Sequence, residues 1–309
     1  MLINNMTRKK SIFRGRKRND LIFYCILLAF PIAQFCVFYI GVNFNSILLA
    51  FKTWDTDTAT FVFNGFDTFK LAFRNLATVA NYRVALRNSF VLYLLAWVTT
   101  TPLTQIVSFF IHKKAPFGQI IQVILFIPSI VSVMVLVTMY QYFVEEAIPS
   151  IATLITGKSY TGLLSNSNTR LLTLFMYGVW NGFGSGMLLY VNAMNSISPA
   201  IREAAKLDGV NFVQEYFHVT FPMIFGTFKT MVIIGAHGII MGGLNLYEFY
   251  GLYAPSNVTN MSYILLQETL LSERSYPMVA ALGIILTCVA APLTFIVRKF
   301  LNKVDPLND

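Results

Sequence analysis

Residues 196–222 read SISPAIREAAKLDGVNFVQEYFHVTFP and predict two short helices joined by a turn. Ser198 is a suitable cap for the first helix, and Pro199 suits its first position, where no backbone donor is needed. Gly209 is a helix stop, because glycine readily adopts the left-handed conformation that ends a helix. A polar helical hairpin therefore interrupts an otherwise apolar chain.

The second helix of this hairpin carries its own start and stop signals. Asn211 followed by Gln214 fits a capping box, and Pro222 is expected to end the helix because it lacks a backbone N–H. Helical spacing separates the residues between them into an apolar set and a polar set. The apolar set is Phe212, Val213, Tyr216 and Phe217, and we expect Glu215 and His218 to lie on the opposite side.

Three residues of the first helix give the hairpin the character of a docking surface. Ala204 and Ala205 are small enough to let another backbone approach closely, and Glu203 beside them supplies a charged anchor. A solvated connector is the simpler alternative, but a connector needs neither paired caps nor a double alanine. We therefore interpret the hairpin as a docking site for a partner protein.

The chain as a whole is too apolar for an ordinary soluble protein. Of its 309 residues, 56% are apolar and 12% are charged, whereas soluble domains average about 45–50% and about 25%. This composition excludes an ordinary soluble enzyme, a disordered chain and a nucleic-acid-binding protein of the usual polar kind. The net charge of +9 includes a basic N-terminal arm. Because an apolar run follows that arm at once, we predict no nucleic-acid partner.

Six long windows contain no Lys, Arg, Asp or Glu. They are residues 21–51, 88–112, 115–144, 171–201, 230–247 and 275–297. A membrane-crossing helix needs about 20 mostly apolar residues, and continuous apolar runs favour helices over a β-barrel. We therefore predict an all-α, polytopic membrane protein with six transmembrane helices. The predicted spans are about 21–48, 86–111, 119–143, 170–194, 225–248 and 276–298, in a transmembrane domain of residues 21–300 between tails 1–20 and 301–309.

The positions of Lys and Arg predict the orientation, because these residues favour the cytoplasmic side of a membrane. With the N-terminus inside, fifteen of the 23 Lys and Arg residues fall on the cytoplasmic side. We therefore expect both termini, and the hairpin of residues 196–222, in the cytoplasm. The charge-free run 249–267 is rich in Asn, Ser, Thr and Tyr, which predicts an outer loop or re-entrant segment.

The hairpin resembles the EAA loop of bacterial ABC importer permeases. The pattern E-A-A-x-x-x-G at residues 203–209, preceded by I-S-P at 197–199, carries this resemblance. The chain is similar to permeases of maltose-type carbohydrate importers, including the branch for oligosaccharides released from polysaccharides, and W-N-G-F-G at 180–184 also fits that branch. Two features depart from the family pattern. The usual I-x-x-P appears as V-x-x-P at 219–222, and the Gly-Gly-Pro often found after span five is absent.

In that family the loop forms a coupling helix seated in a groove of the ATPase subunit. The resemblance therefore implies a type I ABC importer permease in the bacterial cell membrane, with ATP hydrolysed by a partner chain. The implied coupling residues are Glu203, Ala204, Ala205, Asp208 and Gly209. The implied partners are a homologous second permease, an ATPase dimer, an extracytoplasmic sugar-binding protein, the lipid bilayer, and a sugar or oligosaccharide. The outer segment 52–83 is long enough to touch the binding protein.

The sequence predicts no catalytic residues, no cofactor and no metal site. G-K-S at residues 157–159 has the tail of a phosphate-binding loop but lacks the required first glycine. Ion-coupled secondary transport of a small polar solute is the alternative function. It would use His237, the one titratable residue well inside a span, or a helix broken at Gly-Gly 242–243. An intramembrane enzyme is disfavoured, because the spans hold no paired Asp or Glu.

Sugar sites combine aromatic faces with amide and hydroxyl groups, and spans four and five are the richest in such residues. The candidates for the substrate path are Tyr177, Trp180, Asn181, Tyr190, Asn192 and Asn195 from span four, and Asn245, Tyr247 and Glu248 from span five. The alternative is that these groups bind neighbouring helices. Trp97 and Tyr140 are interpreted as interfacial anchors. The alternating Gly182, Gly184 and Gly186 predict a kink or a close-packing site.

Overall fold

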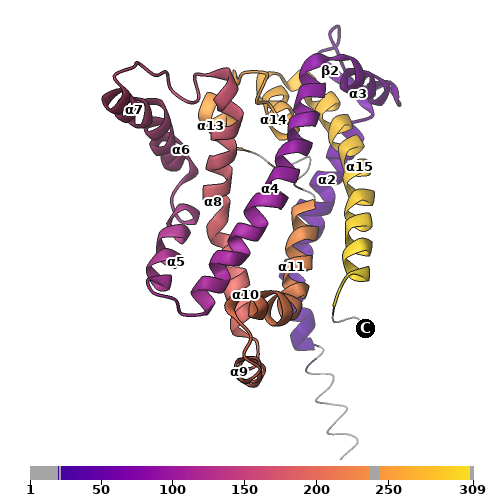
Figure 1. Ribbon diagram of the computed structural model, residues 1–309. Coiled ribbons are helices and arrows are strands. Elements are labelled where there is room, and N and C mark those ends of the chain that lie inside the picture. The colour runs from indigo at the N-terminus through magenta and orange to yellow at the C-terminus, as the bar shows by residue number, and fades with distance from the viewer. Residues whose placement is uncertain (1–19, 21, 237, 239–241, 243, 307–309) are drawn as a thin grey trace, which may run out of the picture.

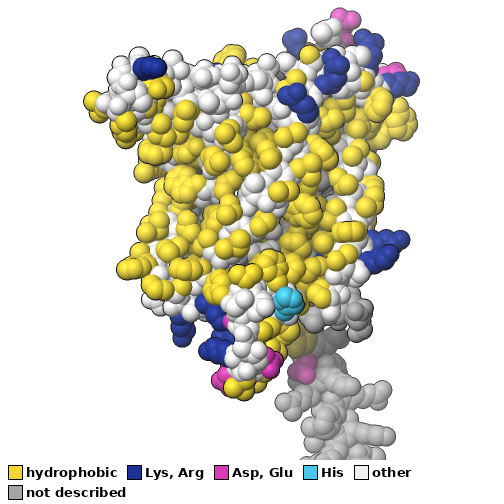
Figure 2. Space-filling view, in the orientation of Figure 1, with side chains coloured by type: hydrophobic (Ala, Val, Ile, Leu, Met, Phe, Trp, Pro, Cys, Tyr) yellow, Lys and Arg dark blue, Asp and Glu magenta, His cyan; other side chains and the backbone are white. Residues whose placement is uncertain are grey.

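Long helices run side by side through the middle of the molecule (Figure 1). The computed structural model describes residues 20, 22–236, 238, 242 and 244–306. The four principal helices are α4 (Ala80–His112), α8 (Ser167–Asn195), α11 (Phe221–Ala236) and α15 (Tyr276–Lys303). Helix α4 packs along α8, and α11 packs against both α8 and α15. Hydrophobic side chains cover the sides of the bundle and charged side chains gather at its two ends (Figure 2), as expected for a protein surrounded by lipid.

Four helical stretches of the described chain are long and apolar enough to cross a membrane, and a bent pair would make a fifth. The four are Ile22–Leu49, Ala80–His112, Phe212–Ala236 and Glu273–Lys303. The first contains the π-helix η1 (Phe35–Gly41) and α2 (Val42–Leu49). The predicted fourth span corresponds to α8, which at 29 residues is long enough to cross, although its polar residues lower its hydropathy below that of the others.

The third predicted span, residues 119–143, is not one continuous helix. Helix α5 (Gly118–Phe126) and the 3-10 turn η2 (Ile127–Ser129) are separated from α6 (Val133–Tyr142) by a short break. The two parts, Gly118–Ser129 and Val133–Thr156, meet at a bend of 106°. Pro128 explains the break, because a proline cannot donate the backbone hydrogen bond that would continue α5. Beyond α6 the chain continues through η3 (Phe143–Ala147) and α7 (Ile148–Thr156).

The fifth predicted span, residues 225–248, is wrong at both ends. Helix α10 (Phe212–Glu215) runs through the π-helix η4 (Tyr216–Thr220) directly into α11, so Pro222 does not end the second hairpin helix. In η4 the Phe221 N–H bonds to the Tyr216 carbonyl five residues back, and this wider turn accommodates the proline. Beyond Ala236 the helix does not reach residue 248, because Asn245 has a positive φ of 54°. His237 and Gly243 lie outside the described residues.

The end of the bundle opposite the hairpin carries structure that the all-α prediction did not include. Strands β1 (Lys52–Asp55) and β2 (Thr60–Phe63) pair antiparallel, with Lys52 opposite Phe63. They are followed by α3 (Asp67–Thr78), which packs on α15 and α4. The same end holds α13 (Leu246–Tyr250), α14 (Met261–Leu271) and η5 (Glu273–Ser275). The predicted loop 249–267 is therefore non-helical only over residues 251–260.

One of the three alternating glycines of α8 lies in a close contact between backbones. A Cβ at Gly184 would lie 2.8 Å from the Leu125 carbonyl oxygen and 3.1 Å from the Phe126 Cα, whereas a Cβ at Gly182 would meet nothing within 4 Å. Backbone atoms of α5 cannot swing aside as a flexible side chain could. Gly184 is therefore the close-packing position, and it sets how near α8 approaches the bent third span.

We expect Gly184→Ala to lower the thermal unfolding midpoint of the purified protein, because the added methyl group overpacks this contact at a typical cost of about 1–3 kcal/mol. Gly182→Ala is the matched control on the same helix. Its methyl group meets open space, so the gain in helix propensity, up to about 1 kcal/mol, should leave the midpoint unchanged or slightly higher. Equal midpoints for the two variants would show that α8 and α5 do not approach as closely as described.

Candidate functional site

Helix α9 (Pro199–Leu207) protrudes from one end of the bundle (Figure 1) and forms the tip of the hairpin. Its C-terminus is closed by Gly209, whose φ of +70° is left-handed as predicted. The Gly209 N–H bonds to the Lys206 carbonyl and the Val210 N–H to the Ala205 carbonyl. This pair of bonds is a Schellman motif, which satisfies carbonyl groups that the helix end would leave free.

The two caps predicted for the hairpin have different outcomes. The capping box of α10 is confirmed, since Asn211 Oδ1 accepts from the Gln214 N–H at 2.9 Å and Gln214 Oε1 from the Asn211 N–H at 3.0 Å. Ser198 has extended backbone angles before α9, but its side chain makes no capping hydrogen bond. Pro199 at the first helical position removes one of the free N–H groups at the start of α9, but not the donors at the next two positions that a serine cap would bind.

Four of the five predicted coupling residues lie on the surface of the hairpin tip. Glu203, Ala204, Asp208 and Gly209 are exposed. Ala205 is instead buried, so it packs the tip against its own chain and leaves Ala204 as the outward-facing alanine. Leu207, which we did not single out, is the most exposed large apolar residue of the described chain at 89%. A leucine between two carboxylates on a protruding tip is suited to insertion into an apolar groove of a partner.

A buried ion pair ties the hairpin to the bundle. Lys113, directly after α4, contacts both carboxylate oxygens of Glu215 at 2.6 and 2.7 Å. Glu215, on the predicted polar side of this helix, is buried, whereas His218 is exposed. The predicted apolar residues Phe212, Val213 and Phe217 are exposed as well. Sequence spacing could not have shown this, because the partner lysine is 102 positions away.

A second polar contact lies beside the ion pair. The Tyr216 hydroxyl donates to Gln105 Oε1 at 2.6 Å, and Gln105 Nε2 donates to the Tyr190 hydroxyl at 3.4 Å. His112 Nδ1 lies 2.7 Å from Asn195 Oδ1. Tyr190 and Asn195 were candidates for the substrate path, and the structure places each in one of these two contacts at the α9 end of the bundle. The exposed Asn192 lies on the same last turns of α8.

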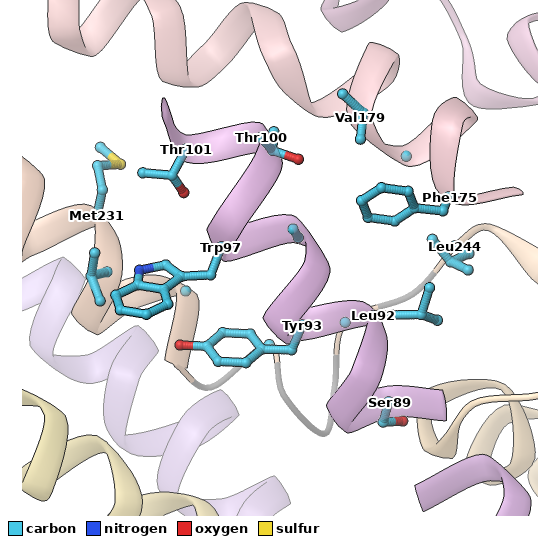
Figure 3. Close-up of a pocket in the computed structure, with 16 residues that line it drawn as sticks. Ser89, Leu92, Tyr93, Trp97, Thr100, Thr101, Phe175, Val179, Met231 and Leu244 are labelled. Atoms are coloured by element: carbon cyan, nitrogen blue, oxygen red, sulfur yellow. The ribbon is translucent and has the colours of Figure 1, made fainter. Parts of the chain in front are cut away.

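A cavity of about 340 Å³ opens between α4, α8 and α11 (Figure 3). Most of its polar groups come from α4 and were not predicted. They are Ser89, Tyr93, Trp97, Thr100 and Thr101. Trp97 was interpreted as an interfacial anchor, but it lies in the middle of α4 and lines this cavity (Figure 3). Their spacing of three or four residues is the signal that could have found them, because it places them along one face of a helix.

Three of the substrate-path candidates meet in an aromatic cluster toward the β1–β2 end of α8. The rings of Tyr177 and Trp180 lie 6.2 Å apart, and Phe249 of α13 meets Tyr177 edge-on at 5.0 Å. Asn245 Nδ2 donates to the Tyr177 hydroxyl at 3.3 Å. Tyr140 of α6 is stacked on Trp180 and donates its hydroxyl to the Thr173 carbonyl, so it is a cluster member rather than a lone anchor.

The side chains of the remaining candidates make no hydrogen bond or ring contact with this cluster that the structure describes, although the Glu248 N–H bonds to the Asn245 carbonyl. Asn181 and Glu248 are half-buried, and Tyr247 is exposed. Leu244, next to Asn245, lines the cavity between α4 and α8 (Figure 3). The cluster and the cavity therefore adjoin, and together they offer aromatic faces, hydroxyls and an amide between the bent third span, α8 and the segment after α11.

Residues 114–306 match the family described as "Binding-protein-dependent transport system inner membrane component". The chain is 25% identical over 212 residues to the arabinooligosaccharides transport system permease protein AraP of Bacillus subtilis, a match that covers 65% of this chain and 66% of that one. It is 20% identical over 279 residues to the multiple sugar-binding transport system permease protein MsmF of Streptococcus mutans, covering 90% and 94% of the two chains.

The fold is that of a solved importer subunit. One chain of a crystal structure of a bacterial ABC transporter involved in the import of the acidic polysaccharide alginate superposes with a TM-score of 0.76 at 20% identity, covering 95% of this chain and 99% of that one. A second structure shows a bacterial alginate transporter in complex with a periplasmic protein bound to an alginate pentasaccharide, with the same TM-score and identity.

Proposed function

This chain belongs to the family of binding-protein-dependent transport system inner membrane components, and we propose that it carries a sugar or oligosaccharide delivered by an extracytoplasmic solute-binding protein. The sugar transport named for the relatives AraP and MsmF supports this substrate class. Family membership also favours binding-protein-dependent import over the alternative of ion-coupled secondary transport. The chain itself supplies the membrane path.

The protruding α9 hairpin is the observation that carries the proposal. A tip fixed by a Schellman motif at the end of α9 and by the adjoining capping box at the start of α10 presents the exposed residues Glu203, Leu207 and Asp208. We place this tip in the cytoplasm, in a groove of a separate ATPase subunit that hydrolyses ATP. A second, homologous permease completes the membrane path, and the solute-binding protein docks at the β1–β2 end, near the segment 52–83.

Right-side-out vesicles that contain the complete transporter and are loaded with ATP would test this function directly. We expect sugar uptake to require ATP and the solute-binding protein, and to persist when proton and sodium gradients are dissipated by uncouplers. Uptake that stops with the uncouplers while ATP remains would restore the ion-coupled alternative and contradict the proposal.

We propose that the aromatic cluster of Tyr177 and Trp180, with Asn245 and the adjoining cavity, forms part of the substrate path. Trp180→Ala should raise the half-saturating sugar concentration for uptake about tenfold, because a lost stacking contact of about 1.4 kcal/mol corresponds to that factor. Tyr142→Ala is the control, since Tyr142 is an exposed aromatic residue of α6 outside the cluster. Equal uptake kinetics in the two variants would remove the cluster from the path.

A further inference from the structure

Helix α3 (Asp67–Thr78) has one face that the rest of the described chain leaves uncovered. Thr68 and Ala72 are buried where α3 packs on α15 and α4. Phe73, which lies well to one side of that contact, is 68% exposed, and Phe66 directly before the helix is 66% exposed. At about 100° per residue these two phenylalanines project in nearly the same direction.

Cationic side chains lie next to this aromatic edge. Lys70 and Arg74 are exposed and occupy the strip of α3 immediately beside Phe66 and Phe73. Lys70 forms an ion pair with Asp67, with 2.7 Å between Nζ and Oδ1, and Asp67 lies on the side of the strip away from the phenylalanines. Figure 2 shows Lys and Arg gathered at this end of the molecule around β2 and α3, directly above the hydrophobic band of the bundle.

The aromatic edge continues onto the neighbouring elements. Phe63 at the end of β2 is 74% exposed. The ring of Phe66 meets the rings of Phe51 and Phe69 at 5.3 and 5.8 Å, so this exposed phenylalanine is held by less exposed ones. Phe51 lies two residues after the first membrane-crossing helix, which ends at Leu49, and this places the surface where the apolar band of that helix ends.

We propose that α3 is an interfacial helix, which seats Phe63, Phe66 and Phe73 in the membrane surface on the β1–β2 side, with Lys70 and Arg74 on anionic lipid headgroups. A helix with a strongly apolar edge, adjacent cations and low overall hydrophobicity is typical of a segment that lies in the plane of the interface. Bilayer lipid is favoured over a protein partner because the surface is continuous with the lipid-facing band, and because cations border the apolar edge.

The anchor also has a consequence for the outer unit formed by β1, β2 and α3. This unit packs on α15 and α4. Its depth in the bilayer therefore determines where these two helices leave the membrane. A solute-binding protein that docks at this end would then meet a surface held by the membrane as well as by the bundle.

Spin-label accessibility would test the proposal on the complete transporter in vesicles. Cys25, Cys36 and Cys288 are first replaced by Ala, and a nitroxide is attached at Phe73→Cys or at Thr78→Cys. Residue 78 is also exposed but projects about 140° away around the helix. In vesicles of phosphatidylethanolamine and phosphatidylglycerol, the label at 73 should be accessible to oxygen and shielded from a water-soluble nickel reagent, and the label at 78 should show the reverse.

The headgroup contact has its own measurement. Lys70→Gln with Arg74→Gln should shift the label at 73 toward water in vesicles that contain phosphatidylglycerol and leave it unshifted in phosphatidylcholine alone. Two results would overturn the proposal. A label at 73 that is shielded from both reagents would show that a protein partner covers this edge. Labels at 73 and 78 that are equally accessible to the nickel reagent would show that the aromatic edge faces water.

Discussion

Charge reversal at Glu203 is expected to abolish ATP-driven uptake and to remove the ATPase subunit from the purified complex. Glu203 is exposed on the tip of the hairpin, next to Ala204 and one turn from Leu207. If an ATPase groove receives this tip, a lysine at 203 places a positive charge where the partner has been shaped for a carboxylate. Unpaired or like charges at the centre of an interface typically cost about 2–5 kcal/mol or more, which corresponds to a loss of affinity of about 30-fold to several thousandfold.

The permease itself should remain folded in this variant. Among the described residues Glu203 has no ion pair, so its reversal breaks no contact within the chain. The measurements are co-purification of the ATPase and uptake in vesicles, with the thermal unfolding midpoint as a check on folding. Glu273→Lys is the matched control for co-purification of the ATPase, because Glu273 is also exposed and lies at the opposite end of the bundle. Normal assembly of Glu203→Lys would contradict the docking role.

The parts of the fold that were predictable are those written in local sequence. Charge-free windows located the helices, because a charge within the hydrocarbon costs far more than an apolar residue; residues 170–194 were predicted for α8 and 167–195 are observed. The hairpin was predictable because its start and stop signals are also local. Gly209 and the Asn211–Gln214 box act over three or four residues, so they retain their meaning wherever the segment lies in space.

The errors arose where a distant element decides what a residue does. Glu215 has a polar side chain in a helix next to solvent, yet it is buried because it forms an ion pair with Lys113 from another part of the chain. Pro222 ordinarily ends a helix, but the π-turn before it preserves the helix. Trp97 resembled an interfacial anchor, because the spacing of the polar residues on α4 defines a helix face but does not show that α8 and α11 enclose a cavity against it.

Removing the charge of Glu215 is expected to separate ATP hydrolysis from transport. The carboxylate joins the hairpin to the end of α4 through Lys113, and α4 packs along α8 and lines the cavity. In Glu215→Gln the docking tip at Glu203 is unchanged, so the ATPase should still bind and hydrolyse ATP. Without the ion pair to Lys113, a movement of the hairpin would displace α4 less. We therefore expect several-fold less sugar transported per ATP, which combined uptake and phosphate-release assays would measure.

The loss of stability should also be measurable, because breaking a buried ion pair by removing one partner costs up to about 3–5 kcal/mol. The actual cost should fall below this range, since the Lys113 side chain is 22% exposed and water can solvate the freed ammonium. Reversing the pair, Lys113→Glu with Glu215→Lys, should recover part of the lost stability and coupling, as a double-mutant cycle would show.

Asp305→Asn provides the matched control for this prediction. Asp305 pairs with Lys229 at 2.7 Å, and the two side chains are 9% and 22% exposed, close to the values for Glu215 and Lys113. That pair joins α11 to the segment after α15 and includes no residue of the hairpin. Its loss should lower the unfolding midpoint similarly while leaving sugar transported per ATP unchanged. If both variants reduced that ratio equally, the defect would reflect general destabilisation, and the ion pair of Lys113 and Glu215 would have no special part in coupling.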